Sequence, residues 1–331
     1  MKKNLFVKLL SVVAVALLTF SSIAGCANGS TSSSGGGATK VLWIITDTDD
    51  TFRKALSDSI VSQASALGVS LDMVETAGSI DTELELISTA KSKGYSAIIC
   101  RPADNATALQ LNVTAEDIPI IYVNNQPSDD HLTADKFIYV GSDEQQAGQY
   151  QAEYVVSKLG KGSMNVIIFE GEKGHSATIN RTLAVKKTLK ANGVNANYVF
   201  VDYANWTDTE AEKEFDIFMK TGQSVDAIFC NNDTMALGAI QGLKNYGLDY
   251  SKILVCGVDA TADGCASIAA GEMSFTVLQN AEGQAAKAVE AAKVLGSGGT
   301  LDNIEGATKD HKYIWVDFEP VDKSNVSKYM K

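Results

Sequence analysis

From residue 41 onward, short apolar runs rich in β-branched residues alternate with longer segments in which apolar residues recur at helical spacing. The short runs are continuously apolar, which is typical of strands buried on both faces of a sheet. They predict strands at residues 41–46, 69–74, 97–100, 118–123, 137–140, 164–169, 197–201, 227–230, 253–258 and 275–278. The clearest helices are predicted at residues 52–67, 81–93, 145–159, 180–191, 208–220, 234–246 and 283–295.

The alternation of strand and helix runs through the chain twice, with a division near Gly141. This pattern predicts an α/β fold with two lobes, each a doubly wound parallel sheet with helices on both faces. Open parallel sheets bind ligands where the carboxyl ends of the strands meet the following loops. Polar residues cluster directly after several of the predicted strands, so we expect the functional site there.

The N-terminus has the features of an export signal. Lysines follow the initiating methionine, and the apolar stretch at residues 9–20 is too short for a permanent membrane-spanning helix. The stretch runs into small residues that end at Cys26, and this ending resembles the lipobox of bacterial lipoproteins. The resemblance implies removal of residues 1–25 and a lipid on the sulfur of Cys26; the alternative is an ordinary secretory signal with a chance cysteine. Residues 26–39, rich in Ser, Thr and Gly, would then be a flexible tether at the outer face of the cell membrane.

The composition excludes several kinds of site. The chain carries 28 basic and 40 acidic residues, a net charge of −12, and would repel a polyanion such as nucleic acid. Cys100, Cys230 and Cys256 end apolar runs, where cysteine behaves as a small buried hydrophobic residue. With no Cys-x-x-Cys pair and only three histidines, no zinc site is expected, and a disulfide between Cys256 and Cys265 is a lesser alternative. We expect no cofactor and no metal.

The loop after the first predicted strand carries the first candidate chemistry. It reads Thr-Asp-Thr-Asp-Asp-Thr-Phe-Arg from Thr46, whereas a nucleotide site would need a Gly-x-Gly-x-x-Gly phosphate cradle. A carboxylate beside an aromatic ring suits a sugar, whose hydroxyl groups donate to carboxylates and whose C–H faces pack on rings. Asp50 and Phe52 fit that chemistry, although Asp50 fits a helix N-cap equally well.

A second segment is more specific. After the predicted strand at residues 164–169 comes Gly-Glu-Lys-Gly-His, ending at His175, with Arg181 six residues beyond the histidine. This segment resembles the glucose/galactose-binding proteins of bacterial ABC transporters, members of the ribose-type periplasmic binding protein family. The similarity covers essentially the whole chain from Val41. Other segments agree in the family's order, at residues 49–52, 122–128, 139–143, 204–206, 231–238 and 256–260.

The resemblance implies roles for particular residues. Phe52 and Trp206 would stack on opposite faces of a pyranose, and Asp50 and Asn124 would hydrogen-bond its hydroxyl groups. The other implied ligand residues are His175, Arg181, Asn232, Asp259 and, at the hinge, Gln279.

Each of these residues also has a structural alternative. The histidine could belong to a loop, the arginine to a solvated helix face and the tryptophan to a core or surface, while Asn232 and Asp259 could be turn or cap residues. The common position after strand-like runs favours a shared site.

The chain departs from the family's pattern at three places. The family has an aspartate two residues after the histidine that bonds the anomeric hydroxyl, and Ala177 stands there. The anomeric end of the ligand is then bound by other residues or makes no hydrogen bond at this position, as for a glycoside. Arg53 stands where relatives have an apolar residue or a second aromatic, and it could reach the site. Only residues 160–163 fill the place of a calcium loop found in some relatives, so no calcium is expected there.

The resemblance implies a type I periplasmic binding protein fold, with two lobes joined by a three-crossover hinge near Gly141, Asn280 and His311. The expected N-terminal lobe comprises residues 40–141 and 281–310, and the expected C-terminal lobe comprises residues 143–279 and 312–331.

The implied function is that of a substrate-binding lipoprotein of an ABC-type sugar importer that binds a monosaccharide, with a glucose/galactose-like hexose favoured. Such a protein is not an enzyme; we expect a monomer that passes its sugar to membrane permease subunits. The main alternative is the same fold binding a pentose, inositol or galactoside as a sensor for a chemoreceptor or kinase. A glycosidase would use Asp50 and Asp259 as its two carboxylates. A LacI-type repressor would need an N-terminal helix-turn-helix in place of the export signal.

Overall fold

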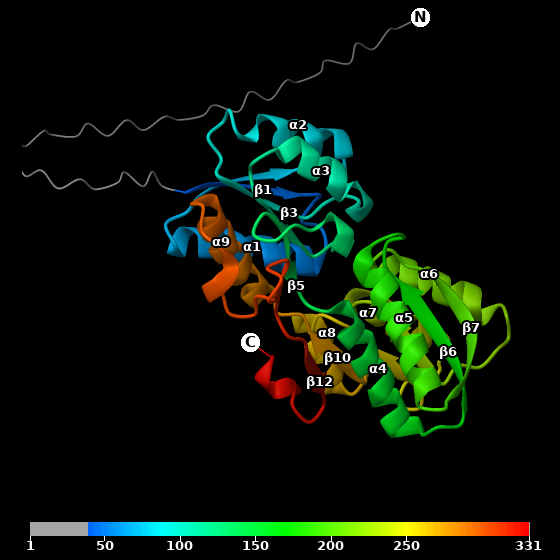
Figure 1. Ribbon diagram of the computed structural model, residues 1–331. Coiled ribbons are helices and arrows are strands. Elements are labelled where there is room, and N and C mark those ends of the chain that lie inside the picture. Colours follow the sequence, from blue (N-terminus) through cyan, green and yellow to red (C-terminus); the bar gives the residue numbers. More distant parts are fainter. Residues whose placement is uncertain (1–38, 331) are drawn as a thin grey trace, which may run out of the picture. The chain divides into compact units, whose positions relative to one another are not determined.

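The computed structural model describes residues 39–330 (Figure 1). These residues form two α/β lobes, each built on a six-stranded sheet. The predicted two-lobe α/β fold is therefore confirmed. Cys26 and the predicted signal and tether lie outside the described residues, except for the last tether position.

The N-terminal lobe has a wholly parallel sheet with the strand order β11-β5-β4-β3-β1-β2. Its strands are β1 (Lys40–Ile45), β2 (Ser70–Glu75), β3 (Ala97–Cys100), β4 (Ile120–Val123), β5 (Phe137–Gly141) and β11 (Tyr313–Trp315). Its helices are α1 (Thr51–Ala66), α2 (Ile80–Ala90), α3 (Ala108–Ala115) and α9 (Ala281–Gly296).

The C-terminal lobe has the strand order β12-β10-β9-β8-β6-β7, and its edge strand β12 runs antiparallel to β10. Its strands are β6 (Ser163–Glu170), β7 (Asn195–Tyr203), β8 (Ala227–Cys230), β9 (Leu254–Cys256), β10 (Phe275–Leu278) and β12 (Glu319–Asp322). Its helices are α4 (Glu144–Leu159), α5 (Ser176–Ala191), α6 (Asp208–Met219), α7 (Asp233–Asn245) and α8 (Ala262–Ala270).

Strand β1 shows why the apolar runs are continuous. Val41, Trp43 and Ile45 pack into one buried cluster with α1 and α9. Leu42 and Ile44 point to the opposite face and pack into a second cluster with α2 and α3. Successive side chains of a strand alternate between faces, so a sheet covered by helices on both sides needs an apolar residue at every position. The C-terminal sheet is buried in the same way, with α4 and α5 on one face and α6, α7 and α8 on the other.

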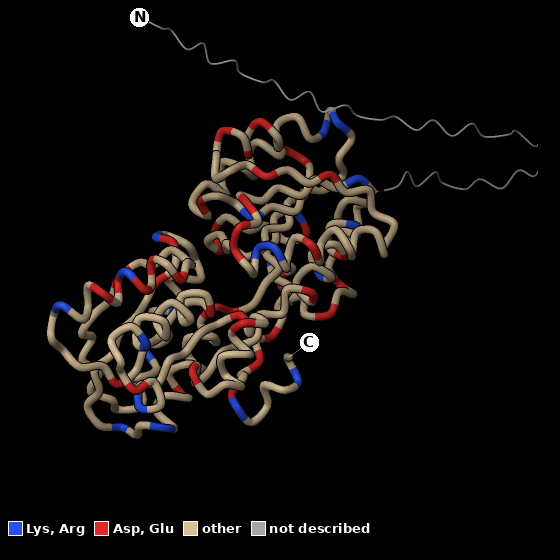
Figure 2. The backbone as a smooth tube through the Cα atoms, turned by 180° about the vertical axis from the view of Figure 1, so that it is seen from behind, with Lys and Arg blue, Asp and Glu red and all other residues tan. Residues whose placement is uncertain are grey.

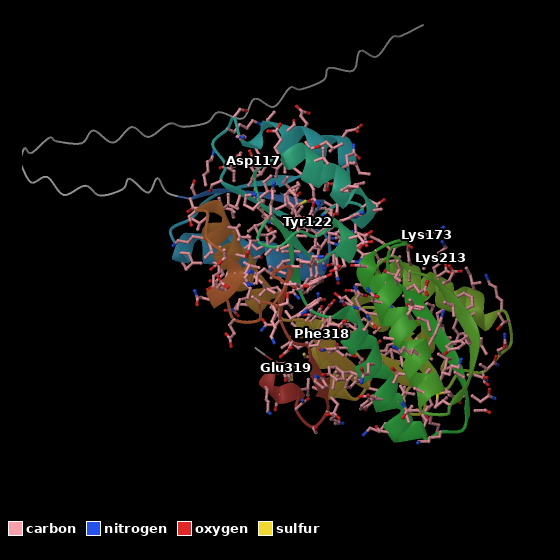
Figure 3. All side chains as sticks on the ribbon, viewed as in Figure 1. Asp117, Tyr122, Lys173, Lys213, Phe318 and Glu319 are labelled. Carbon is pink, nitrogen blue, oxygen red and sulfur yellow. The ribbon has the colours of Figure 1, made fainter. Side chains whose placement is uncertain are left out.

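The end of the chain is divided between the lobes differently from the prediction. Tyr313–Trp315 forms β11 and pairs in parallel with β5, so it extends the N-terminal sheet. The assignment of residues 312–331 to the C-terminal lobe, with a crossover at His311, is therefore wrong for this strand. The third crossover lies at residues 316–318, where Figure 3 labels Phe318 just before β12. Strand β11 is only three residues long, too short to be recognised as a separate apolar run in the sequence.

Three helices also differ from the prediction. Helices α3 and α8 were not predicted, because α3 exposes the apolar side chains of Leu109 and Val113 and α8 is rich in small residues. The polar and apolar faces of both helices are thus hard to distinguish in the sequence. Helix α5 begins at Ser176 rather than at residue 180, because the side chain of His175 caps its first turn.

The other two crossovers lie close to their predicted places. Residues 142–143 connect β5 to α4, and residues 279–280 connect β10 to α9. The Nε2 of Gln284 in α9 donates to the Oγ of Ser142 over 3.1 Å, which ties the first crossover to the helix that follows the second. The four cysteines in the described part of the chain are free and buried, so no Cys256–Cys265 disulfide is formed.

Charged positions are distributed over both lobes. Figure 2 shows acidic and basic positions interspersed along the described chain. Such a distribution, with the net charge of −12, gives no support to nucleic-acid binding.

Within residues 39–330, no helix has both the length and the apolar character needed to span a bilayer.

Candidate functional site

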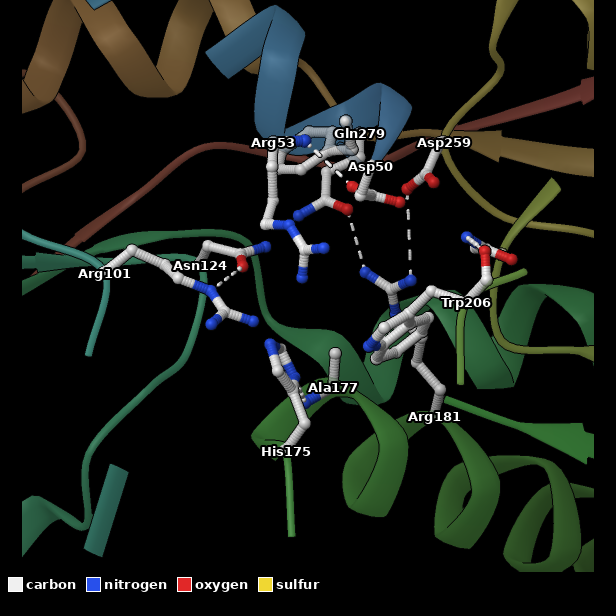
Figure 4. Close-up of a pocket in the computed structure, with 12 residues that line it drawn as sticks. Asp50, Arg53, Arg101, Asn124, His175, Ala177, Arg181, Trp206, Asp259 and Gln279 are labelled. Carbon is white, nitrogen blue, oxygen red and sulfur yellow. Dashed lines mark hydrogen bonds and ion pairs between the residues drawn. The ribbon is translucent and has the colours of Figure 1, made fainter. Parts of the chain in front are cut away.

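One cavity between the lobes gathers the residues that the sequence predicts for a ligand site. The space between its side chains is about 310 Å³, part of it open to solvent. Figure 4 shows side chains from both lobes pointing into this space. It is lined by Asp50, Phe52, Arg53, Arg101 and Asn124 of the N-terminal lobe, by His175, Ala177, Arg181, Trp206, Asn232 and Asp259 of the C-terminal lobe, and by Gln279 of a crossover.

Three of these residues are helix N-caps at the carboxyl ends of strands. Asp50 caps α1 by accepting from the backbone N–H of Arg53 at 2.9 Å with Oδ1, which leaves Oδ2 for another partner. His175 caps α5, and Asn232 caps α7. The capping role is therefore confirmed and is compatible with a site role, because a helix that follows a parallel strand begins at the edge of the sheet where ligands bind.

Asn232 differs from the other two caps. Its Oδ1 accepts from the N–H of Met235 at 2.9 Å, and its Nδ2 donates to the carbonyl oxygen of Trp206 at 3.2 Å. Both polar atoms thus have partners within the C-terminal lobe. Asn232 supports Trp206 and lines the cavity, and its implied direct contact with ligand stays a prediction.

Residues with left-handed backbone conformation concentrate at the cavity. Asn124 has φ +60°, Trp206 has φ +68° and Asp259 has φ +117°. Asn205 and Ala260, which neighbour the last two in sequence, have φ +46° and +51°. Non-glycine residues avoid this region because Cβ crowds the backbone, and such strain clusters at functional sites. The fold holds these side chains at the cavity against a local conformational cost.

The two predicted stacking rings come from opposite lobes. Phe52 packs into the core of the N-terminal lobe, and Trp206 packs into the core of the C-terminal lobe. The Trp206 ring meets the His175 ring edge-on, with centroids 5.3 Å apart. A Cβ at Gly171 would clash with the Trp206 ring, so only glycine fits beside the indole. Both rings line the same cavity.

Arg181 is the centre of a buried polar network. Its guanidinium donates to Glu144 Oε2 at 2.6 Å, to the carbonyl of Asn231 at 2.6 Å and to Gln279 Oε1 at 2.8 Å. Its Nη1 also lies 3.9 Å from Oδ1 of Asp259. Figure 4 shows Arg181 directed toward Gln279 and Asp259. Arg181 is thus not a solvated helix residue. Three of its five donors have protein acceptors, and its implied contact with ligand stays a prediction.

Two ionisable groups at the cavity are perturbed by burial. Burial raises the pKa of Asp259 well above its ordinary value, and the charge of Arg181 opposes that rise. Burial lowers the pKa of His175 well below its ordinary value, and the positive charge of Arg101 adds to this effect. His175 Nδ1 accepts from the N–H of Ala177 at 3.1 Å, so the neutral ring carries its proton on Nε2 and offers a donor.

Comparison with known proteins gives the family. Residues 41–300 match the family model of the periplasmic binding protein domain. The chain belongs to this family. A protein of Rhizobium meliloti that is named for rhizopine binding is 30% identical over 286 residues, which are 85% of this chain and 89% of that protein. The D-galactose/methyl-galactoside binding periplasmic protein MglB of Haemophilus influenzae is 26% identical over 299 residues, 86% of this chain and 89% of that protein.

Solved structures confirm the predicted type I periplasmic binding protein fold. An ABC transporter solute binding protein from Bacillus halodurans C-125, solved with myo-inositol, has a TM-score of 0.80 and 27% identity, and the match covers 90% of this chain and 99% of that chain. The myo-inositol binding protein of Caulobacter, also solved with myo-inositol, has a TM-score of 0.76 and 25% identity, with 89% and 96% covered. This periplasmic binding protein is a substrate-binding protein and not an enzyme, and its family implies an extracytoplasmic location.

One cavity residue of this periplasmic binding protein was not predicted from sequence. Arg101 is only 2% exposed; its Nε donates to Asn124 Oδ1 at 3.2 Å and its Nη1 to Thr46 Oγ1 at 3.0 Å. It directly follows the apolar run of β3, so its position at the carboxyl end of a strand was the available signal. Arg53, named from the sequence as a residue that could reach the site, also lines the cavity.

Two buried donors at the cavity have no protein partner in the described residues. They are Nε of Arg53 and Nε2 of Gln279. A buried donor without an acceptor costs free energy, so each favours a ligand that brings an acceptor. The cavity of this periplasmic binding protein thus offers donors beside the carboxyl groups of Asp50 and Asp259.

A buried carboxyl group that contacts the loop after β3 predicts that the stability of the protein depends on pH. Glu83 is fully buried; its Oε1 accepts from the N–H of Ala103 at 2.8 Å, and its Oε2 has no partner in the described residues. Burial raises the pKa of Glu83 from 4.5 to about 7. Between the pKa of 4.5 in the unfolded chain and about 7 in the folded protein, only the folded protein keeps the proton on Glu83. The free energy of unfolding therefore falls as the pH rises through this window, and it levels off above about pH 7.

We therefore expect the wild type to lose up to about 3 kcal/mol across this window relative to Glu83→Gln, which cannot ionise. Urea denaturation of both proteins at a series of pH values measures the difference, and every other titrating group contributes equally to both curves. Two curves that stay parallel across the window would contradict the prediction.

Proposed function

We propose that this periplasmic binding protein captures a monosaccharide or a ring polyol of similar size between its lobes and delivers it to an ABC-type importer. The observation that carries the proposal is the cavity itself, in which aromatic rings and hydrogen-bonding side chains from both lobes converge. A ligand that touches both lobes stabilises the conformation in which they meet, and membrane subunits can recognise that conformation.

The lining matches the chemistry of a polyhydroxylated ring. Phe52 and Trp206 offer apolar faces to C–H groups of a ring. Asp50 Oδ2 and a carboxyl oxygen of Asp259 accept from hydroxyl groups, and His175 Nε2 donates to a hydroxyl oxygen. Because a hydroxyl both donates and accepts, neighbouring hydroxyl groups can satisfy acceptors and donors that lie side by side.

A glucose/galactose-like hexose is the first candidate ligand, and myo-inositol is the second. MglB is named for D-galactose and methyl-galactoside, which supports the hexose. The solute binding proteins from Bacillus halodurans and Caulobacter were solved with myo-inositol, which supports the cyclitol. Ala177 lines the cavity at the position where relatives have the aspartate that bonds the anomeric hydroxyl. Inositol has no anomeric centre, so it would not need that aspartate. A pentose or a galactoside is a further alternative.

The attachment and partners are part of the same proposal. Lipidation at Cys26 would hold the protein, a monomer, at the outer face of the membrane within reach of permease subunits. A sensor that presents its ligand to a chemoreceptor or kinase is the alternative use of the same cavity. Radiolabelled-palmitate incorporation that is lost in Cys26→Ser would support the anchor, and unlabelled wild type would refute it.

Isothermal titration calorimetry against D-glucose, D-galactose, methyl-galactoside, myo-inositol and D-ribose tests the ligand class. We expect a saturable binding heat with a hexose or with myo-inositol. Absence of heat with every member of the panel would refute the sugar-binding proposal, and the ranking among the members would identify the ligand.

Asp50→Asn separates the two roles of Asp50. Asparagine is as good an N-cap as aspartate, so the cap of α1 and the melting temperature should stay unchanged. The charged acceptor is lost, and a hydrogen bond to a charged group is worth about 1.5–3 kcal/mol, so affinity should fall by about tenfold or more.

Asp104→Asn is the matched control, because Asp104 also caps a helical turn, accepting from the N–H of Ala106 at 2.9 Å with Oδ1, and it lies outside the crossovers and does not line the cavity. We expect calorimetry to give wild-type affinity for this variant. Equal affinities of Asp50→Asn and Asp104→Asn would restrict Asp50 to its capping role.

A further inference from the structure

Glu172 belongs to the C-terminal lobe but pairs with two arginines of the N-terminal lobe. It lies in the loop between β6 and α5, next to Lys173, which Figure 3 labels at the side of its lobe that faces the other lobe. Its Oε1 lies 3.3 Å from Nη1 of Arg53, and its Oε2 lies 3.4 Å from Nη2 of Arg101. One carboxylate therefore spans two guanidinium groups across the boundary between the lobes.

The two arginines need an anion between them. Both guanidinium groups lie beside the one carboxylate of Glu172, so their like charges repel each other, and burial with the charge of Arg53 lowers the pKa of Arg101. Arg53 has a second carboxylate partner within its own lobe, Asp47, at 2.8 Å. In the described residues Arg101 pairs with no carboxylate other than Glu172, and its partners in its own lobe are the neutral Asn124 and Thr46.

The pairing bears directly on the cavity. Arg53 and Arg101 line it, and Arg53 Nε is buried there without a protein partner. The same loop continues into Ser176, whose N–H donates to Asn125 Oδ1 at 3.2 Å and whose Oγ accepts from the N–H of Gln126 at 2.8 Å. These bonds place the loop against the N-terminal lobe, so the carboxylate of Glu172 meets the arginines only when the lobes are together.

We propose that Glu172 is a positioning residue of the binding site. Its carboxylate favours the closed form of the protein and fixes the guanidinium groups of Arg53 and Arg101 at the cavity wall, where they contact the ligand. The effect on closure is independent of the ligand, whereas the effect on affinity rests on the proposed sugar-binding function. Loss of this carboxylate leaves two cations facing each other at the cavity, which opposes closure.

Glu172→Gln tests the proposal, with Glu153→Gln as the control. Glu153 is exposed on α4 of the same lobe and has its side-chain hydrogen bond with Gln149 of its own helix, so this variant changes the net charge equally. Small-angle X-ray scattering of the ligand-free proteins measures closure at low and high salt. We expect the wild type and the control to expand as salt screens the pairs, and Glu172→Gln to be expanded at both salt concentrations.

Stopped-flow binding of D-galactose and myo-inositol measures the effect of Glu172 on ligand affinity. Because the pairs are partly exposed, we expect Glu172→Gln to weaken binding by about five- to tenfold, mainly through faster dissociation, with an unchanged melting temperature. Glu172→Asp keeps the charge on a shorter side chain and should recover part of the affinity. A residue with a purely structural role would change the melting temperature and leave the salt dependence of the affinity unchanged.

Scattering profiles and dissociation rates of Glu172→Gln that match those of Glu153→Gln would overturn the proposal. If the wild type binds no member of the calorimetry panel but Glu172→Gln still expands the ligand-free protein, the role of Glu172 in closure is supported and the sugar-binding function is refuted. The two failures are therefore distinguishable.

Discussion

Replacing Arg181 with leucine is expected to lower the free energy of unfolding by about 3–5 kcal/mol, because it leaves a buried carboxylate without its partner. Glu144 is 1% exposed, and its Oε2 accepts from Arg181 Nε at 2.6 Å. Its Oε1 has no hydrogen-bond partner in the described residues, so Arg181 supplies most of what stabilises its charge. Leucine would also leave the carbonyl of Asn231 without its donor. Urea denaturation of the ligand-free protein measures the loss.

The double variant Arg181→Leu/Glu144→Gln is the control. Removing both charges takes away the cost of the unpaired carboxylate, so the double variant should be more stable than Arg181→Leu alone. Additive losses from Arg181→Leu and Glu144→Gln would contradict the coupling, because pairs that interact directly show non-additive effects.

The location of the site could be predicted from sequence, but its internal bonding could not. Asp50, Asn124 and Asp259 each follow a continuous apolar run, and parallel strands bring such positions to one edge of a sheet. The partners of Arg181 are different: Glu144 and Gln279 lie 37 and 98 residues away in the sequence. Such pairs depend on how the helices and crossovers pack, which no local pattern encodes.

The differences from the sequence prediction have the same origin. Arg101 was overlooked because a single arginine after a short strand looks like an ordinary surface residue, and only the fold shows that it is buried against Asn124. The short strand β11 belongs to the N-terminal sheet although it follows most of the C-terminal lobe in the sequence. Three residues are too few to predict this return from the sequence. Continuous apolar runs of four or more residues, by contrast, identified the central strands of both sheets.

Replacing Trp206 with alanine is expected to weaken sugar binding by about 30- to 1,000-fold, the effect of losing about 2–4 kcal/mol at a central aromatic contact. Trp206 is 9% exposed and lines the cavity, and its conformation is fixed by the hydrogen bond from Asn232 and by the close approach of Gly171. A ring held in place in this way loses little side-chain entropy when it covers a ligand. Calorimetry with the sugar identified by the panel measures the loss.

Trp206 also belongs to the core of its lobe, so a loss of stability must be separated from a loss of affinity. Phe218→Leu is the matched control, because Phe218 is a fully buried aromatic of the same cluster and does not line the cavity. It should lower the melting temperature and leave the affinity unchanged at temperatures where both variants are folded. Trp206→Phe, which keeps an aromatic face at the cavity, should bind more tightly than Trp206→Ala. If Trp206→Ala bound the sugar as tightly as the wild type, the ligand could not lie between Phe52 and Trp206.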